Sequence, residues 1–225
     1  MGCRRGAWDC QCQVVSANAL AAALADLVLP RCCVGCRRPG RPLCAVCAST
    51  RPLHVDAGGL PVVAAGGYDG AVRAALIAYK EHGRRDLGGP LGDLLARALA
   101  CGSARLLVPV PSRARVARSR GGDHVLRLAR VAARRRAARV ATPLRLVRAV
   151  RDSAGLGLRE RAANVSGAMA AAPPPRPGAE VVIVDDICTT GATLREAARA
   201  LEEAGWSVRG AAVVAATQRR AGCGG

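Results

Sequence analysis

The chain has 225 residues, of which 51% are hydrophobic, enough for one ordinary domain with a buried core and a small appendage. Aromatic residues make up only 2% and phenylalanine is absent, so the core must be built from alanine, valine and leucine. The formal net charge of +18 favours an anionic ligand, and no apolar run approaches the roughly 18–20 residues that a membrane-spanning helix needs.

The positive charge is concentrated in the middle of the chain. Between Arg113 and Arg151 there are 13 arginines and one acid, whereas residues 180–205 contain six acids and two arginines. This asymmetry indicates a polyanionic ligand, either nucleic acid or a phosphorylated small molecule. A solvated basic helix explains the same charges. Because Lys80 is the only lysine, genome composition also explains many of the arginines.

Residues 1–30 are expected to form an N-terminal tail and a short helix. The stretch ANALAAALADLVL (17–29) follows two arginines but contains Asp26, and Asp9 lies in the segment before it. A secretory signal peptide would carry neither acid, so we expect an amphipathic helix and a cytoplasmic protein. In that compartment the 11 cysteines of the chain favour metal binding or reduced thiols over disulfides.

Residues 31–50 contain two C-x2-C motifs in the stretch RCCVGCRRPGRPLCAVC. Each motif turns two sulfurs toward one point, so a pair of them can complete a tetrahedral site of four thiolates. The predicted zinc ligands are Cys33, Cys36, Cys44 and Cys47. Such a site is structural because no coordination position stays open. Unpaired reduced thiols, an iron–sulfur cluster and the use of Cys32 in place of Cys33 remain alternatives.

Residues 51–225 are predicted to alternate between strands and helices. Strands are expected at 60–68 and 106–111, and helices at 70–82, 91–100 and 123–140, with Gly88, Gly89 and Pro90 separating the first two helices. A strand at 143–150 and a helix around 158–168 follow. A strand then leads to Asp185, and Thr193 and Glu196 form a capping box that opens a helix closed by Gly205. The last strand is 208–217. This order predicts an α/β fold with a mostly parallel sheet flanked by helices.

The stretch VVIVDDICTTGATL (181–194) places two acids at the end of an apolar strand, before a loop rich in threonine. A P-loop or a receiver domain needs a lysine that the chain lacks, and the glycine spacing of a dinucleotide site is absent. Backbone N–H groups at a helix N-terminus can hold a phosphate, and carboxylates can accept hydrogen bonds from the vicinal hydroxyls of ribose. The stretch therefore predicts a site for a ribose phosphate.

At these residues the chain resembles the phosphoribosyl pyrophosphate (PRPP) signature of type I phosphoribosyltransferases. The resemblance implies a type I phosphoribosyltransferase fold, with Asp185 and Asp186 as the catalytic residues that contact ribose. The residues implied to bind PRPP are these two acids and the loop that follows them: Thr189, Thr190, Gly191, Ala192 and Thr193.

Across residues 26–217 the order of features resembles the ComF family of competence-associated phosphoribosyltransferase-like proteins. These features are the four cysteines, Tyr68 leading to Lys80, V-P-V-P at 108–111, R-G at 120–121, R-x-x-N at 161–164 and the PRPP loop. The chain departs from the family at Gly122, Asp123 and His124, where F-N-Q is common, and at Ser153, where glutamine is usual. We expect His124 to face solvent and Cys188 to be a small apolar filler.

The resemblance implies a glycosyltransferase that moves phosphoribosyl from PRPP to an unknown nitrogen acceptor, with Mg²⁺ bound alongside the pyrophosphate. The residues expected to contact pyrophosphate are Lys80, Ser112, Arg113, Arg118 and Arg120. A second hypothesis is a competence protein that binds single-stranded DNA and other DNA-uptake proteins, with segment 113–151 and the zinc knuckle in contact with DNA phosphates. DNA affinity would then fall steeply with salt.

Overall fold

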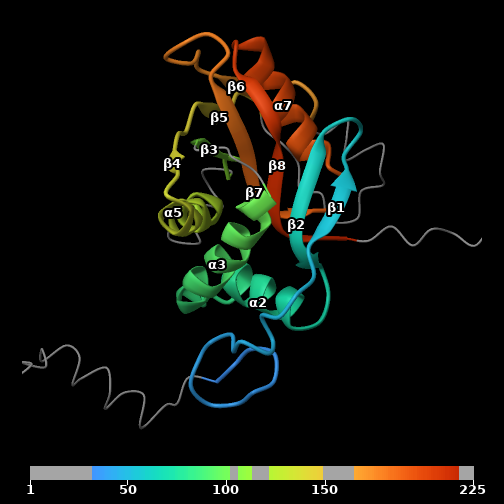
Figure 1. Ribbon diagram of the computed structural model, residues 1–225, viewed down its shortest axis with the longest axis vertical. Helices are drawn as coiled ribbons and strands as arrows, with labels where there is room; N and C mark the ends of the chain where they lie inside the picture. Colours follow the sequence, from blue (N-terminus) through green and yellow to red (C-terminus); the bar gives the residue numbers. More distant parts are fainter. Residues whose placement is uncertain (1–31, 102–105, 113–121, 149–164, 218–225) are drawn as a thin grey trace, which may run out of the picture.

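The computed structural model describes residues 32–101, 106–112, 122–148 and 165–217 (Figure 1). A six-stranded sheet runs through this part of the chain in the order β1-β2-β8-β7-β3-β4. Its strands are β1 (Leu53–Asp56), β2 (Pro61–Gly67), β3 (Leu106–Pro109), β4 (Arg139–Val140), β7 (Glu180–Cys188) and β8 (Ser207–Ala216). Only β1 is antiparallel to its neighbour, so the sheet is mostly parallel.

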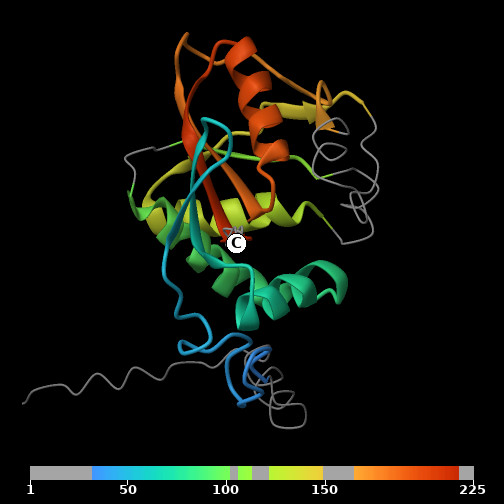
Figure 2. The same cartoon turned by 90° about the vertical axis from the view of Figure 1, so that its right-hand side faces the viewer.

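Helices cover both faces of this sheet (Figures 1 and 2). One face is covered by α2 (Gly70–Glu81), α3 (Gly88–Ala98) and α5 (His124–Arg136), with short 3-10 turns at Arg85–Leu87 and Leu99–Cys101. The other face is covered by α7 (Ala192–Glu203) and a small antiparallel sheet of β5 (Leu144–Leu146) and β6 (Met169–Ala171). The predicted α/β fold class is therefore confirmed.

The central strand β7 supplies both cores because its side chains alternate between the two faces. Val182 and Val184 pack toward α2, α3 and α5, whereas Val181 and Ile183 pack toward α7. A strand that is buried on both faces reads as a continuous apolar run, which is what the sequence shows before Asp185.

Several predicted elements are confirmed in the described residues. The strand predicted at 60–68 is β2, and the strand at 106–111 contains β3. The arginine-rich helix begins at His124, with the Asp123 side chain accepting the N-cap hydrogen bond from the Leu126 N–H. It ends at Arg136 rather than at Val140 as predicted, because Ala137 has a left-handed backbone, φ 50°, and Arg139–Val140 form β4.

Four details of the sequence prediction are wrong. Gly88, Gly89 and Pro90 form the first turn of α3 rather than a break, because a first-turn proline lacks only an N–H that has no acceptor within the helix. The strand predicted at 143–150 is only Leu144–Leu146 and lies outside the main sheet. The edge strand β1 was not predicted.

The capping box is also wrong. Helix α7 begins at Ala192 with Gly191 as its N-cap, so Thr193 and Glu196 do not have the required spacing from the cap. Glu196 instead accepts a hydrogen bond from the Met169 N–H and pairs with Arg199, which ties β6 to α7. The predicted helix at 17–29 and nearly all of the one around 158–168 lie outside the described residues.

The cysteine-rich segment 32–50 lies at the end of the molecule next to α2, far from the top of α7 (Figures 1 and 2). Its buried residues Cys33 and Leu43 join the core under α2 and α3. Among the described helices, none has the length and apolar character to cross a bilayer.

The contact between α3 and α5 depends on Gly92. A Cβ at this position would lie 2.4 Å from the Cβ of Val131 on α5. We expect Gly92→Ala to lower the free energy of unfolding by about 1–3 kcal/mol in urea denaturation, because the two helices would have to separate. Gly89→Ala is the matched control in the same helix, since its Cβ would meet no atom within 4 Å. Equal stability of the two variants would contradict this packing.

Candidate functional site

The two adjacent acids lie within β7, near its carboxyl end, rather than after it. Asp186 is contacted by Lys80 from α2 and by His124 from α5, whereas the described residues show no ion pair of Asp185 with either group. The Asp186 residue is 5% exposed, whereas Asp185 is half-buried. The two carboxylates therefore have different environments.

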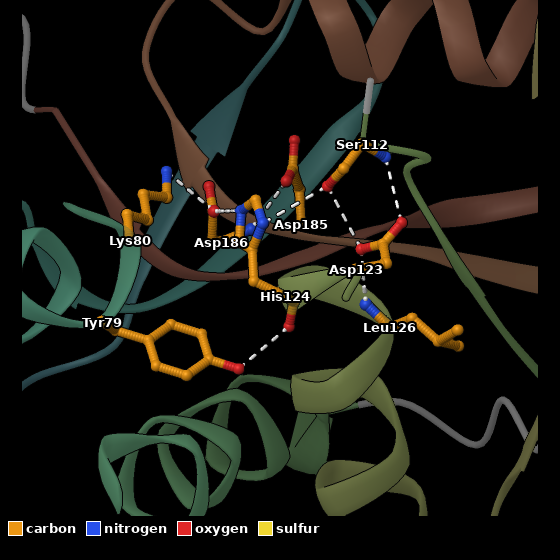
Figure 3. A network of polar contacts seen from close by, with 8 residues as sticks. All are labelled: Tyr79, Lys80, Ser112, Asp123, His124, Leu126, Asp185 and Asp186. Carbon is orange, nitrogen blue, oxygen red and sulfur yellow. Dashed lines mark hydrogen bonds and ion pairs between the residues drawn. The ribbon is translucent and has the colours of Figure 1, made fainter. Parts of the chain in front are cut away.

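Two basic groups converge on the Asp186 carboxylate (Figure 3). Lys80 Nζ, from the last turn of α2, lies 2.7 Å from Oδ2 of Asp186. His124 Nε2, from the first residue of α5, lies 2.7 Å from the same oxygen. These contacts join two helices to the central strand at the edge where doubly wound sheets bind ligands.

His124 does not face solvent, which corrects the expectation from sequence. The residue is 8% exposed, and its ring Nδ1 lies 3.3 Å from Oγ of Ser112, directly after β3. The Tyr79 hydroxyl donates to the His124 carbonyl, and the two rings meet edge to face. Asp123 accepts hydrogen bonds from both the backbone N–H and the hydroxyl of Ser112.

These contacts set the ionisation of the two acids in opposite directions. Although burial opposes ionisation of Asp186, Lys80 and His124 hold the pKa of its carboxyl well below its usual range. Burial, together with the neighbouring Asp186 carboxylate, raises the pKa of Asp185 to about 8. At neutral pH the negative charge of the pair is therefore concentrated on Asp186.

The threonine loop connects β7 to α7. Thr189 and Thr190 form the turn, Gly191 has a left-handed backbone with φ 72°, and Ala192 and Thr193 begin the helix. The first N–H groups of a helix have no acceptors within it, so the N-terminus of α7 faces this loop with free donor capacity and a partial positive charge. The Thr190 hydroxyl accepts one such bond from the Ala192 N–H at 3.3 Å.

The loop is fixed from outside by Arg195 and Thr217. The Arg195 guanidinium donates to the carbonyls of Thr190 and Ala57, and the Thr217 hydroxyl donates to the Thr189 carbonyl. A Cβ on Gly191 would lie 2.4 Å from the Ala57 Cβ, so glycine also permits the close approach of the β1–β2 hairpin. A cavity of about 650 Å³ lies between this hairpin and the loop.

The structure brings some of the predicted ligand-binding residues together. Asp185 and Asp186 precede the threonine loop by a few residues, and Lys80 contacts Asp186 from α2. The Ser112 hydroxyl contacts His124, which in turn contacts Asp186. Arg113, Arg118 and Arg120 lie outside the described residues, as do Ser153 and the R-x-x-N motif. Cys188 is 2% exposed in the apolar core, as expected of a filler residue.

The four predicted metal ligands form a cluster. The Sγ atoms of Cys33, Cys36, Cys44 and Cys47 all lie within 4.8 Å of one another. In a tetrahedral zinc–thiolate site with bonds of about 2.3 Å, neighbouring sulfurs are separated by about 3.8 Å. The Cys36 and Cys44 sulfurs are 3.7 Å apart, so the cluster fits a metal ion such as zinc. Cys32 is not part of the cluster.

The backbone around this cluster favours a thiolate. Burial opposes ionisation of Cys33, but backbone N–H groups of Cys36, Cys44 and Gly35 lower the pKa of its thiol to about 6. Burial and the three neighbouring sulfurs raise the pKa of Cys47 to about 12. Without a cation, four sulfurs this close cannot all ionise, whereas a bound metal would compensate their charge.

Comparison with known proteins agrees with this site. Residues 125–222 match the family model described as "Phosphoribosyl transferase domain". The match includes β7, the threonine loop and α7, and it begins one residue after His124. No curated protein matches the chain. Residues 125–222 are therefore similar to a phosphoribosyl transferase domain, and the structure adds a mostly parallel sheet with a four-cysteine cluster ahead of it.

Sequence reasoning missed three contributors to the site. Tyr79 precedes Lys80 in α2, and nothing in the sequence indicates that its hydroxyl reaches α5. Arg195 was indistinguishable from the many other arginines. His124 was detectable in principle, because Asp123 is a good N-cap residue and the first turn of a capped helix at a sheet edge often faces a ligand site.

The opposite pKa shifts of Asp185 and Asp186 predict opposite changes in stability when each acid is replaced by asparagine. The raised pKa of Asp185 means that the folded state resists its ionisation, so this residue costs stability increasingly as pH rises from about 4 to about 8. We expect Asp185→Asn to raise the melting temperature of the ligand-free protein at pH 7. Asp186→Asn should lower it, because Lys80 and His124 lose their shared carboxylate.

Differential scanning fluorimetry at pH 5, 7 and 8 measures both effects. The increase in melting temperature of Asp185→Asn over the wild type should grow with pH and be smallest at pH 5. Asp93→Asn, which removes a half-exposed carboxylate paired with Arg135 at the surface, is the matched control and should change little. A similar loss of stability in Asp185→Asn and Asp186→Asn would refute the division between them.

Proposed function

We propose that the protein is a phosphoribosyltransferase of the ComF family that transfers phosphoribosyl from PRPP to a nitrogen acceptor in the cytoplasm. The observation that carries the proposal is the sequence of groups at the carboxyl end of β7. A half-buried acid, a loop of threonines and the N-terminus of α7 follow one another within eight residues. Together they offer acceptors for ribose hydroxyls and donors for a phosphate.

On this proposal, Asp185 and Asp186 have different roles in binding PRPP. Asp185, for which the described part of the chain shows no ion pair with Lys80 or His124, accepts hydrogen bonds from the ribose hydroxyls. Asp186 holds Lys80 and His124 beside the pyrophosphate subsite. The backbone N–H groups of Thr189 to Thr193 bind the 5′-phosphate, and Arg195 keeps the loop in place for it.

The reaction is a displacement at C1 of the ribose. The C1–O bond to pyrophosphate breaks, its electron pair leaves with pyrophosphate, and the lone pair of the acceptor nitrogen forms the new C1–N bond. The acceptor then releases its N–H proton to solvent. The ribose carries positive charge in the transition state and the leaving group gains negative charge. On this proposal the Lys80 ammonium, which lies beside Asp186, stabilises the leaving pyrophosphate.

The residues present fit a magnesium ion that is held mainly by substrate. Mg²⁺ commonly takes one or two carboxylates and fills its other positions with water and phosphate oxygens. Asp186 Oδ2 already contacts Lys80 and His124, which leaves Asp185 as the accessible carboxylate, directly or through water. Bound with pyrophosphate, the ion would neutralise charge on the leaving group.

Assignment to the ComF family is supported by the order of features along the chain. The four-cysteine cluster lies ahead of a phosphoribosyltransferase-like domain, and the cluster packs against the core under α2. The departures at Gly122, Asp123 and His124 lie beside the pyrophosphate subsite rather than in the threonine loop. They leave PRPP binding intact on this proposal.

A pyrophosphate-release assay tests the activity. With PRPP, Mg²⁺ and a panel of nucleobases, ammonia and amines, we expect turnover with at least one acceptor. The Asp185→Asn/Asp186→Asn double variant should lose at least about 100-fold in rate, because both ribose and leaving-group contacts are removed. Asp93→Asn should keep the activity. Turnover that survives the double substitution would reject the site, and PRPP binding without any turnover would favour a non-catalytic competence protein.

We further propose that the cysteine cluster binds one structural zinc ion per chain. The sulfur geometry and the N–H groups around Cys33 support a closed thiolate site with no open position for catalysis. Cys36→Ser is expected to reduce the zinc content, measured by elemental analysis, from about one to near zero, and to lower the melting temperature.

Cys32→Ser is the control for the zinc prediction. Cys32 is adjacent to Cys33 but lies outside the cluster, so its replacement should leave the zinc content unchanged. Zinc loss in Cys32→Ser together with zinc retention in Cys36→Ser would show that Cys32, and not Cys36, is a ligand. Folded wild-type protein that contains no metal would reject the site.

A further inference from the structure

Helix α2 lies between the cysteine cluster and the candidate site. The cysteine-rich segment 32–50 lies against this helix in both views of the molecule (Figures 1 and 2), and Lys80 in its last turn contacts Asp186. We infer that the metal-loaded cysteine cluster positions Lys80 for pyrophosphate, because it holds α2 from the side opposite the site. The metal and the ligand in this inference rest on the proposed function, whereas the contact between the cluster and α2 does not.

A close contact joins the first C-x2-C turn to the first turn of α2. A Cβ on Gly35 would lie 2.6 Å from the Cβ of Ala71 and 2.8 Å from Sγ of Cys47. The backbone of the first C-x2-C turn therefore lies directly against the helix, and a sulfur of the second motif lies at the same place. A shift of the sulfurs relative to one another changes the surface on which α2 packs.

The contact continues to the last turn of α2. Cys33 is fully buried and Leu43 is nearly so, and both belong to the apolar core that includes Ala78 of α2. A cavity of about 670 Å³ beside this turn is lined by Cys33 together with Ala78 and His82. The cluster therefore lies along the helix from its beginning to its end.

Lys80 leaves α2 on the side opposite these contacts. An α-helix turns by about 100° per residue, so Ala71, Ala78 and His82 lie on one face, within about 40° of one another. Lys80 follows Ala71 by nine residues and is therefore turned by about 180° from it. Its Nζ lies 2.7 Å from Oδ2 of Asp186. The last turn of α2 is thus held between the cluster and the central strand.

The position of this last turn depends on packing. Helix α2 has 12 residues, about the length at which an isolated helix is only marginally stable in water. Leu76 is fully buried and fixes the middle of the helix in the core, but Glu81 and His82, which follow Lys80, are exposed. The contact at Ala78 is therefore important for holding Lys80 at its place.

The cysteine-rich segment in turn depends on a metal. Residues 32–50 form turns and one isolated bridge, between Cys32 and Pro39, with no helix or longer strand. The Arg97 guanidinium on α3 donates to the Ala48 carbonyl and the Thr50 hydroxyl, which fixes the end of the segment. The turns that carry the sulfurs precede this anchor, and metal binding supplies the folding free energy of such small thiolate sites. Loss of the metal should therefore loosen the last turn of α2.

Hydrogen–deuterium exchange tests the hold on α2 without a ligand. Backbone amides of residues 77–82 should exchange at least about tenfold faster in Cys36→Ser, which removes an exposed sulfur of the cluster, than in the zinc-loaded wild type. Amides of α7, which packs on the other face of the sheet, should exchange equally in both proteins. Equal protection of residues 77–82 in a folded, metal-free variant would overturn the inference.

Calorimetry with magnesium pyrophosphate tests whether the cluster acts through Lys80. We expect Cys36→Ser to weaken binding about tenfold in the wild-type background but less than about twofold in a Lys80→Met background, since an absent lysine cannot be displaced. Lys80→Met alone should also weaken binding about tenfold. Equal losses in the two backgrounds would mean that the cysteine substitution disturbs the protein generally, and would reject the positioning role.

A second pair of variants keeps all four cysteines and decides the matter if Cys36→Ser fails to fold. Gly35→Ala should retain about one zinc ion per chain, yet speed the exchange of residues 77–82 and weaken pyrophosphate binding, because its Cβ displaces Ala71. Val46→Ala, at a side chain that is 75% exposed in the same segment, is the matched control and should change neither measurement. Zinc-loaded Gly35→Ala with wild-type exchange and affinity would count against the inference, as would a wild type that binds no metal.

Failure of the inference and failure of the proposed function give different results. If the zinc-loaded wild type binds neither pyrophosphate nor PRPP, the proposed function is rejected, and the exchange of α2 still shows whether the cluster holds the helix. If pyrophosphate binds with an affinity that does not depend on the cluster, the proposed function stands and the inference is wrong.

Discussion

The site depends on the contact of Asp186 with Lys80 and His124. A buried carboxylate is stable only when it is paired and hydrogen-bonded, and both partners come from helices on one face of the sheet. The contact therefore joins the ends of α2 and α5 to the end of β7. It also brings Ser112 close to the acids, because His124 contacts both Asp186 and Ser112.

The contacts of the two acids near the end of β7 explain why two identical residues have different chemistry. Asp186 is contacted by Lys80 from α2 and by His124 from α5, whereas Asp185 lies beside the Asp186 carboxylate and pairs with neither group in the described residues. One acid therefore loses its proton readily and the other retains it. A pair of acids in sequence thus gives one structural anchor and one group that is available to a ligand.

The sequence predicted those features that depend on local patterns. Apolar runs and glycines located β2, β3 and β8, and the spacing of two C-x2-C motifs identified four sulfurs that do come together. Prediction from the sequence failed where tertiary contacts determine the role of a residue. Glu196 had the spacing of a capping residue but is used to bind β6, and His124 was assigned to solvent because its partners Asp186 and Ser112 are distant in sequence. Short strands such as β1 are defined mainly by their pairing with β2 and carry little signal of their own.

Asp123 and His124, two of the residues at which the chain departs from the ComF pattern, are linked through Ser112. Asp123 caps α5, and this fixes the direction in which His124 leaves the first turn of that helix. The same carboxylate lies within hydrogen-bond distance of the Ser112 N–H and hydroxyl, and that hydroxyl also contacts His124 Nδ1. Replacing either residue alone would leave a buried donor or acceptor without its partner, which costs more than the bond itself contributes. Asp123 and His124 are therefore best understood as a pair, since both contact the Ser112 hydroxyl.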